Sequence, residues 1–455
     1  MSELARDPYS ALRHAGYRHF LAGNFLSNVG RQALSVAVAW QIYQWTNSAT
    51  ALGLVGLVNV LPLLALVLPA GALADRFNRR LIIVRTMALS ALLSIALVAV
   101  SYYHTSIPRL DILQQANDWL HRFALVFERQ ADPATLHFDQ PALPVLYLIL
   151  FLHAVMRVLA GPSRAALVPL LVPTSALSNA VTWSASTFEL STVVGPALGG
   201  MMVAVSGYSS VYALDVLASL SLAVLLLGVK FAPPSSLAAR PPGGMLAGVG
   251  FMWRNKQILA AMTLDLFAVV LGGATALLPI YADRILHVGP AGLGWLRAAP
   301  AVGAICMAMF TAHRSSARRP GLLMLWSAAG FGAAIGLFSL STVFWLSLLA
   351  LFLSGAFDNY SVVVRHTLVQ LMTPDALRGR VTAVNQLFIG SSNEISALRA
   401  GLSAALFGPV MAAGVGGLGT IAVTVLIALL MPSLKNVPPL HQVKTEPEEL
   451  EPSVV

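Results

Sequence analysis

The sequence has 455 residues, of which 57% are hydrophobic and 10% are charged, with a formal net charge of +9 and a mean hydropathy of +0.75. A soluble globular protein carries roughly 25% charged residues, so this chain would expose too much apolar surface to stay dissolved. The composition excludes soluble enzymes, nucleic-acid-binding domains and disulfide-stapled secreted folds, and it predicts an integral membrane protein. The single cysteine, Cys306, lies in an apolar run and allows no internal disulfide.

The apolar runs are long and continuous, which predicts membrane-spanning helices rather than the alternating strands of a barrel. A span with its loop needs roughly 35 to 40 residues, so the chain accommodates about twelve. The predicted spans are 18–45, 49–74, 81–104, 142–170, 178–205, 208–231, 256–282, 289–312, 320–340, 342–368, 380–408 and 412–432.

Positive charge is distributed unequally between the two sets of connecting segments. Most lysines and arginines outside the spans fall on one side, whereas the other side carries only Arg109, Arg122, Arg129 and Arg284. Because positive loops stay in the cytoplasm, both termini are predicted to be cytoplasmic, which agrees with an even number of spans. The net charge therefore marks orientation in the inner (plasma) membrane, and we expect no nucleic-acid partner.

A linker divides the spans into two sets of six. Residues 232–255 include PPSSLAARPPGG and predict a cytoplasmic linker between an N-terminal bundle, 1–231, and a C-terminal bundle, 256–432. ALSNAVT at 176–182 lines up with ALRGRVT at 376–382, which indicates an internal duplication and pseudo-two-fold symmetry. The acidic tail, 433–455, is predicted to be disordered.

The first bundle contains one long outer connection, 105–141. Apolar residues recur every three or four positions within 111–130, which predicts an amphipathic helix. Such a helix would lie on the outer membrane surface or cap the outer mouth of the protein. A decoration without function is the alternative.

The predicted cytoplasmic loop after the second span reads GALADRFNRR. It resembles the G-x-L-A-D-R-x-x-R-R/K signature of the major facilitator superfamily, with Asn78 in place of the usual glycine. Gly71 would let two helices approach closely, Asp75 can sit at a helix end, and the arginines can form pairs that break when the protein changes conformation. An ordinary positive-inside loop is the alternative. The candidate cytoplasmic gate residues are Gly71, Asp75, Arg76, Arg79 and Arg80.

Two further segments resemble motifs of the same superfamily. Arg157 and Gly161 in the fourth span resemble its R-x-x-x-G motif, which the family links to proton transfer. STVVGPALGG in the fifth span resembles the G-x-x-x-G-P-x-x-G-G motif of antiporters, which favours export over uptake. Without the family, this glycine run would be a small-residue packing seam. The candidate hinge residues are Gly195, Pro196, Gly199 and Gly200.

The whole chain is similar to the enterobactin-exporter branch of the superfamily. Local resemblances include SARRPGLLMLWS at 316–327 and LLPIYADRI at 277–285. Drug and macrolide efflux pumps and lysophospholipid transporters share this scaffold, so the resemblance leaves the substrate open among these classes.

Polar residues inside spans are the functional candidates, because burying them in a bilayer is costly. The proton-coupling candidates are Glu189, Asp265 and Glu394, and the cavity and substrate candidates are Asn24, Asn28, Arg31, Arg157, Asp358 and Arg365. Burial disfavours a charged carboxylate and a nearby arginine favours it, so alternating these environments would bind and release a proton. A structural ion pair is the alternative for each carboxylate.

The sequence predicts an all-α secondary transporter that exports an amphipathic siderophore or drug-like compound by proton antiport. A lysophospholipid transporter or an uptake symporter is the alternative within transport, and a membrane sensor or membrane-embedded enzyme is a remote one. No phosphate-binding loop and no metal-ligand spacing occur in the sequence, so we expect no enzyme activity, no metal and no cofactor beyond the proton gradient. The expected partners are a small-molecule substrate and the lipid bilayer, with the protein acting as a monomer.

Overall fold

The computed structural model describes residues 7–104, 106, 108, 110–129, 135–138, 140–229, 244–313, 319–439 and 442. Helices make up most of this described part of the chain, and no strand occurs in it. The segments predicted as spans are occupied by α1 (Ala15–Thr46), α2 (Ala49–Arg76), α3 (Arg79–Tyr103), α5 (Ala142–Leu167), α6 (Leu177–Ser206), α7 (Tyr208–Leu227), α9 (Lys256–Gly272), α11 (Gly289–Ala312), α12 (Pro320–Leu340), α13 (Phe344–Met372), α14 (Asp375–Phe407) and α15 (Pro409–Leu430). Shorter helices are α4 (Asp111–Phe127), α8 (Gly244–Arg254), α10 (Leu278–Ile280) and α16 (Pro432–Lys435).

The all-helical membrane fold is confirmed. Within the described residues, 10 helical segments are long and apolar enough to cross a membrane. α1 and α14, with 32 and 33 residues, are long enough but fall outside this set. Polar side chains such as Arg31 in α1 and Glu394 in α14 lower their hydropathy. The count of twelve spans stays a prediction.

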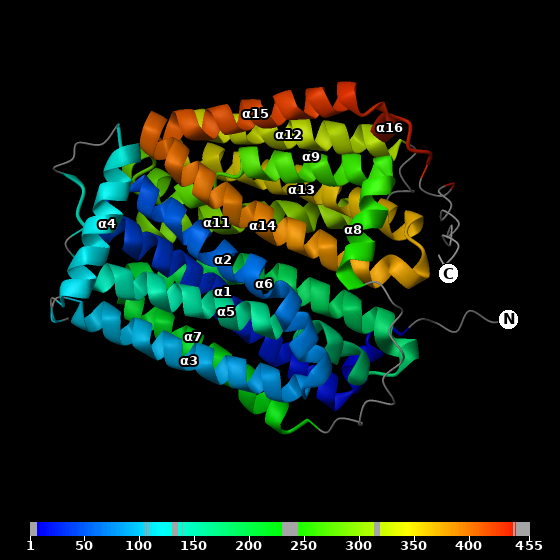
Figure 1. The fold of residues 1–455 in the computed structure, drawn as a ribbon, viewed down its shortest axis with the longest axis horizontal. Helices are drawn as coiled ribbons and strands as arrows, with labels where there is room; N and C mark the ends of the chain where they lie inside the picture. The colour runs from blue at the N-terminus through cyan, green and yellow to red at the C-terminus, as the bar shows by residue number, and fades with distance from the viewer. Residues whose placement is uncertain are drawn as a thin grey trace, which may run out of the picture.

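The helices form two sets that pack mainly among themselves. The first half consists of α1, α2, α3, α5, α6 and α7, and the second half consists of α9 and α11 to α15. Figure 1 shows the first half in the lower part of the view and most of the second half above it, with the long helices running in the same general direction. The principal contacts between the halves are α2 with α14 and α6 with α11.

The buried apolar core is shared by the two halves at one end only. Among the described residues, one cluster joins Leu120 of α4 and Leu52 of α2 to Leu293 of α11 and Ala400 of α14. At the other end, the core separates into a first-half cluster and a second-half cluster. The start of α1 and α16 lie at this divided end, opposite α4 (Figure 1).

α4 confirms the predicted amphipathic helix and packs on α2, α5 and α14. Residues 128–129, which follow α4, connect α2 with α14 across the shared end, and we call them the strap. Glu128 is 7% exposed, and its Oε1 accepts hydrogen bonds from Ser48 Oγ at 2.7 Å and Thr50 N at 2.9 Å. A carboxylate is favourable there because the N-terminus of α2 carries partial positive charge. One residue later, Arg129 N donates to Ala405 O of α14 over 3.1 Å, which ties the first half to the second.

The seventh predicted span, 256–282, is not one continuous α-helix. α9 ends at Gly272, and a 3-10 turn (Thr275–Leu277), α10 and a π-helical turn (Tyr281–Ile285) continue the path. Arg399 Nη2 of α14 donates to the Gly273 carbonyl oxygen at the break over 3.0 Å. A carbonyl freed from a helix inside a membrane needs such a donor, and this side chain supplies it.

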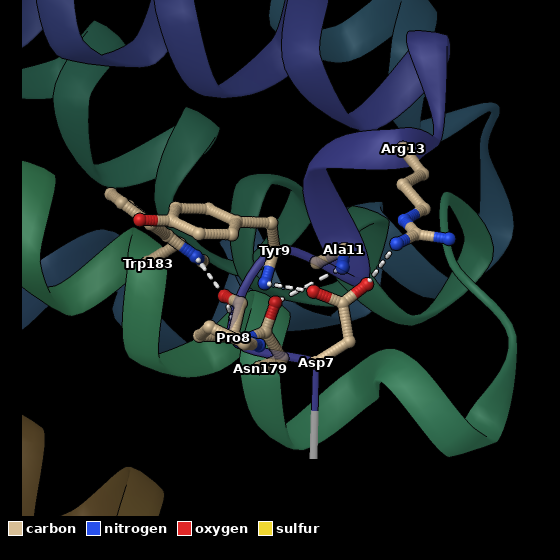
Figure 2. Close-up of polar contacts among 7 residues, drawn as sticks. All are labelled: Asp7, Pro8, Tyr9, Ala11, Arg13, Asn179 and Trp183. Carbon is tan, nitrogen blue, oxygen red and sulfur yellow. Dashed lines mark hydrogen bonds and ion pairs between the residues drawn. The ribbon is translucent and has the colours of Figure 1, made fainter. Parts of the chain in front are cut away.

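The amino-terminal segment is bound to the start of α6, as Figure 2 shows. Asn179 accepts from Ala11 N at 3.0 Å and donates to the Pro8 carbonyl at 2.7 Å, and Trp183 Nε1 donates to the same carbonyl at 3.0 Å. Asp7 and Arg13 form an ion pair of 2.7 Å. The segment is therefore held within the first half at the divided end.

Part of the predicted linker, 232–255, is helical. α8 (Gly244–Arg254) packs on α14 and α9, which agrees with the apolar character of GMLAGVGFMWR. The preceding part, 232–243, lies outside the described residues, as does most of the predicted acidic tail, 433–455.

Candidate functional site

An ion pair joins the two halves near the middle of their helices. Arg157 Nη2 of α5 lies 3.3 Å from Glu394 Oε1 of α14. The side chains are 39% and 20% exposed, so both retain some access to the space around them. Asn59 of α2 also hydrogen-bonds to the Glu394 carboxylate. The sequence predicted both members of the pair as functional residues, but it did not indicate that they contact each other.

Three further arginines join Arg157 in what we call the arginine cluster, which consists of Arg31, Arg157, Arg164 and Arg297. Arg31 of α1 lies within electrostatic reach of Arg157 and Arg164, and of the carboxylates of Asp215 and Glu394. Arg297 of α11 lies within reach of Glu394 and donates to the Ser35 carbonyl of α1 over 3.3 Å. The four arginines outnumber the two carboxylates, so the region around the cluster carries excess positive charge.

The predicted cavity residues of α1 position the arginines. Asn24 Oδ1 accepts from Arg164 Nη1 at 3.2 Å, and Ser27 Oγ accepts from Arg164 Nη2 at 3.3 Å. Asn28 is buried, and its Oδ1 lies 3.5 Å from Arg31 Nη2. The polar stripe on α1 thus bonds to guanidinium groups of the cluster.

Asp265 and Arg365 lie inside the second half rather than between the halves. They form an ion pair between α9 and α13, and their side chains are only 8% and 2% exposed. Asp358 lies beside them, where it lines a void of about 10 Å³ with Asp265, Ser327 and Ser361. Such a void holds about one water molecule, so this site has no room for an organic substrate.

Glu189 occupies a different environment from the other two proton-coupling candidates. It is half-buried on α6, and in the part of the chain that the structure describes its carboxylate has no hydrogen bond or ion pair. It lies within electrostatic reach of Asp358 of α13. Glu394 is therefore the candidate carboxylate that the structure pairs across the halves.

The arginines of the predicted gate bind helix ends within the first half. Arg79 donates from Nε to the Ala74 carbonyl at 3.2 Å and from Nη1 to the Ala166 carbonyl at the end of α5 at 3.3 Å. Arg80 Nη2 donates to the Leu227 carbonyl at the end of α7. Positive side chains are favourable at these carbonyl-rich C-termini.

The other gate residues include one corrected prediction. Asn78, which replaces the family's usual glycine, caps α3 because its Oδ1 accepts from Arg80 N at 3.0 Å and Leu81 N at 3.4 Å. Gly71 was expected to admit a neighbouring helix, but a Cβ added there would meet nothing within 4 Å, so this expectation is wrong for this conformation. Asp75 is half-buried near the end of α2, and Arg76 is exposed.

The predicted hinge glycines of α6 lie at two close helix contacts. A Cβ on Gly195 would lie 2.8 Å from the Val29 carbonyl oxygen of α1, and one on Gly199 would lie 2.7 Å from Ala33 Cα. A Cβ on Gly200 would lie 2.8 Å from Gly294 Cα of α11, in the other half. Pro196 is buried within the helix. These contacts show the packing seam that small residues permit.

A larger cavity in the second half shares Ser327 with the void beside Asp265 and Asp358. It measures about 570 Å³ and lies among α11, α12, α13 and α15 of the second half. Its lining is apolar and aromatic and includes Phe310, Trp326 and Phe357. None of the predicted site residues lines it.

Sequence comparison finds relatives over nearly the whole chain. Residues 6–114 and 134–453 match the profile of a family described as transmembrane secretion effector. The enterobactin exporter EntS of Citrobacter koseri is 27% identical over 424 residues, which cover 93% of each chain. EntS of Escherichia coli K12 is 26% identical over 424 residues, again covering 93% of each chain.

Solved structures of bacterial transporters share the fold. A bacterial homologue of the human lysosomal transporter Spinster, inward-facing and unoccupied, matches with a TM-score of 0.66 and 13% identity, covering 96% of this chain and 100% of that chain. A bacterial homologue of the iron transporter ferroportin, in an inward-facing state, matches with a TM-score of 0.62 and 15% identity, covering 94% and 99%. The fold described above is therefore that of known membrane transporters.

Proposed function

The chain belongs to the transmembrane secretion effector family within the major facilitator superfamily, and from that premise we propose that it exports a siderophore-like, amphipathic anion in exchange for protons. In this proposal, twelve spans form two six-helix bundles, 1–231 and 256–432, and both termini lie in the cytoplasm. The protein acts as a monomer in the inner membrane. The proton gradient drives it without a cofactor.

The arginine cluster is the observation that carries the substrate class. Arg31, Arg157, Arg164 and Arg297 outnumber the two carboxylates within their reach, Glu394 and Asp215. Guanidinium groups bind planar anionic groups through several donors at once, which suits a substrate with multiple acidic oxygens. The enterobactin exporters, which are similar along 93% of this chain, support a siderophore-like compound.

The divided core supports transport by alternating access. The halves share one apolar core at the α4 end and have separate cores at the end where the termini lie. With the termini in the cytoplasm, the two halves are in contact at the outer ends of their helices and have separate cores at the cytoplasmic ends. The opposite state requires the outer contacts, including the strap at Arg129, to break while the inner ends meet.

Glu394 is the proposed site of exchange between substrate and proton. It is bonded to Arg157 in the present state, and a bound anion would compete for the same guanidinium group. In an exchange, the anion and the proton are bound in alternation. The anion leaves Arg157 on the outer side before a proton neutralises Glu394. That proton leaves on the cytoplasmic side before the next anion binds.

A secretion assay tests the substrate and the direction of transport. Cells that lack their own enterobactin exporter and drug pumps would express this chain, and enterobactin would be measured in cells and medium. We expect the chain to raise enterobactin in the medium and lower it in the cells, whereas Arg157→Gln should not. Unchanged enterobactin secretion, with secretion or flipping of lysophospholipid or a cationic drug instead, would overturn the proposed substrate class.

A further inference from the structure

A chain of three polar side chains crosses the interior of the first half. Ser94 Oγ of α3 donates a hydrogen bond of 2.6 Å to Asp215 Oδ2 of α7, and His153 Nε2 of α5 lies 3.3 Å from the same Ser94 oxygen. Asp215 is 3% exposed and Ser94 is fully buried. Asp215 belongs to neither the candidate gate nor the predicted proton-coupling residues.

Asp215 has no ion-pair partner among the described residues, and its carboxylate accepts a hydrogen bond from Ser94. Arg31 of α1 acts on Asp215 electrostatically, without a hydrogen bond or ion pair between them among the described contacts. α1 approaches closely, since a Cβ on Gly30 would lie 3.0 Å from Asp215 Oδ1. A buried carboxylate with one hydrogen bond is costly to keep ionised, and protonation removes that cost.

The geometry points to a proton-binding site formed by Asp215, Ser94 and His153, separate from the Arg157–Glu394 pair and connected to it through His153. This inference rests on the proposed exchange of substrate for protons and adds the place where the first half holds its proton. Its ligand is a proton, and Ser94 is the bridging group. Asp215 and His153 are the two groups that carry the proton in turn.

The transfer balances without any further reactant. With the proton on Asp215, the carboxyl donates to Ser94 Oγ, and Ser94 donates to an unprotonated His153 Nε2. When the proton moves, the carboxyl O–H bond breaks, Ser94 gains that proton and gives its own to His153, and an N–H bond forms on the imidazole. Ser94 ends unchanged, with its hydroxyl now donating to the Asp215 carboxylate, as in the described geometry.

The link to transport runs along α5. His153 and Arg157 are spaced four residues apart and therefore share one face of the helix. While Glu394 neutralises Arg157, a positive His153 is tolerated nearby. Separation of Glu394 from Arg157 leaves the guanidinium charge uncompensated, which repels the proton from His153. Movement of α14 thus controls proton occupancy in the first half.

Infrared difference spectroscopy can observe this proton directly. The purified protein in liposomes would be titrated from acid to alkaline pH, and the carbonyl band of protonated carboxylic acids would be followed. We expect one component of the band to be absent in Asp215→Asn. In Ser94→Ala the component should be retained but shifted in frequency, because its hydrogen-bond partner is removed. The matched control is Asp118→Asn, which removes an exposed acid on α4 and should retain the component assigned to Asp215.

Two results would overturn the inference: an Asp215→Asn band identical to the wild type, or a Ser94→Ala band with no frequency shift. The second remains decisive if Asp215→Asn does not fold. The outcome is separate from the proposed function, because the band needs no substrate. If the Asp215 component titrates but no pH gradient drives export, the proton site stands and antiport fails.

Discussion

Gly200 of α6 and Gly294 of α11 bring the backbones of the two halves into contact near the end where they share one core. A Cβ on Gly200 would lie 2.8 Å from Gly294 Cα, and one on Gly294 would lie 2.5 Å from the Pro196 carbonyl oxygen. The second principal contact between the halves, that of α2 with α14, has a similar pair of glycines, Gly53 and Gly401. Glycine at these positions allows close approach without fixing the halves by long side chains, which suits contacts that form and break.

A large residue at Gly200 should therefore open the outer end. Overpacking costs about 1–3 kcal/mol, which corresponds to an increase of roughly five- to 150-fold in the open population. In a Cys306→Ser background, Gly200→Leu should speed labelling of Ser35→Cys by an impermeant maleimide added from outside. Gly161→Leu is the matched control, because a Cβ added there would meet nothing within 4 Å. Equal labelling rates in the two variants would contradict this role for Gly200.

The Arg157–Glu394 pair should show energetic coupling in transport. Because Arg157 is 39% exposed, solvent screens the pair, and we expect a coupling of about 1 kcal/mol, at the upper end for exposed pairs. Initial export rates of the wild type, Arg157→Gln, Glu394→Gln and the double variant form a double-mutant cycle. The double variant should be less impaired than the sum of the single effects. Strictly additive effects would show that the contact plays no part in the cycle.

The Asp265–Arg365 pair should contribute mainly to stability. Both side chains are nearly inaccessible, and removal of one partner of a buried pair costs about 3–5 kcal/mol. Thermal unfolding in detergent should show a large loss of stability in Asp265→Asn and recovery in Asp265→Leu combined with Arg365→Met. If the double variant is folded and stable yet loses proton coupling, Asp265 is a proton carrier after all.

Glu128 should stabilise the closed outer end. Its Oε1 accepts two hydrogen bonds at the start of α2, and hydrogen bonds to charged groups contribute roughly 1.5–3 kcal/mol. Glu128→Ala should therefore lower the unfolding temperature and also speed outside labelling of Ser35→Cys. Arg122→Ala on the exposed face of α4 should do neither. An unfolding temperature equal to the wild type would exclude this contribution.

The positions of the helices could be predicted because each depends on a local run of apolar residues. The predicted outer helix, 111–130, also matches α4 closely, since its periodicity lies within one segment. The break after Gly272 could not be predicted in this way. It depends on Arg399, a residue of α14 that is distant in sequence and supplies the missing donor.

The residues of the candidate site could be predicted better than the contacts that they make with each other. Glu394 and Arg157 stood out as charges inside apolar spans, but their contact depends on how α5 and α14 are rotated about their axes. The same limit applies to Asp215, whose partner Ser94 is an ordinary serine in an apolar helix. Close approach at Gly71 was predicted from a motif, yet the surrounding helices do not fill the space beside it in this conformation.

Transport into everted membrane vesicles tests the proposed exchange most directly. An acid-inside pH gradient would be imposed, and accumulation of enterobactin in the lumen would be followed in vesicles with wild-type protein, Glu394→Gln, Glu189→Gln or no protein. We expect gradient-dependent accumulation in the wild type, its loss when an ionophore collapses the gradient, and its loss in Glu394→Gln. Enterobactin accumulation at the same rate with and without the gradient would contradict proton antiport.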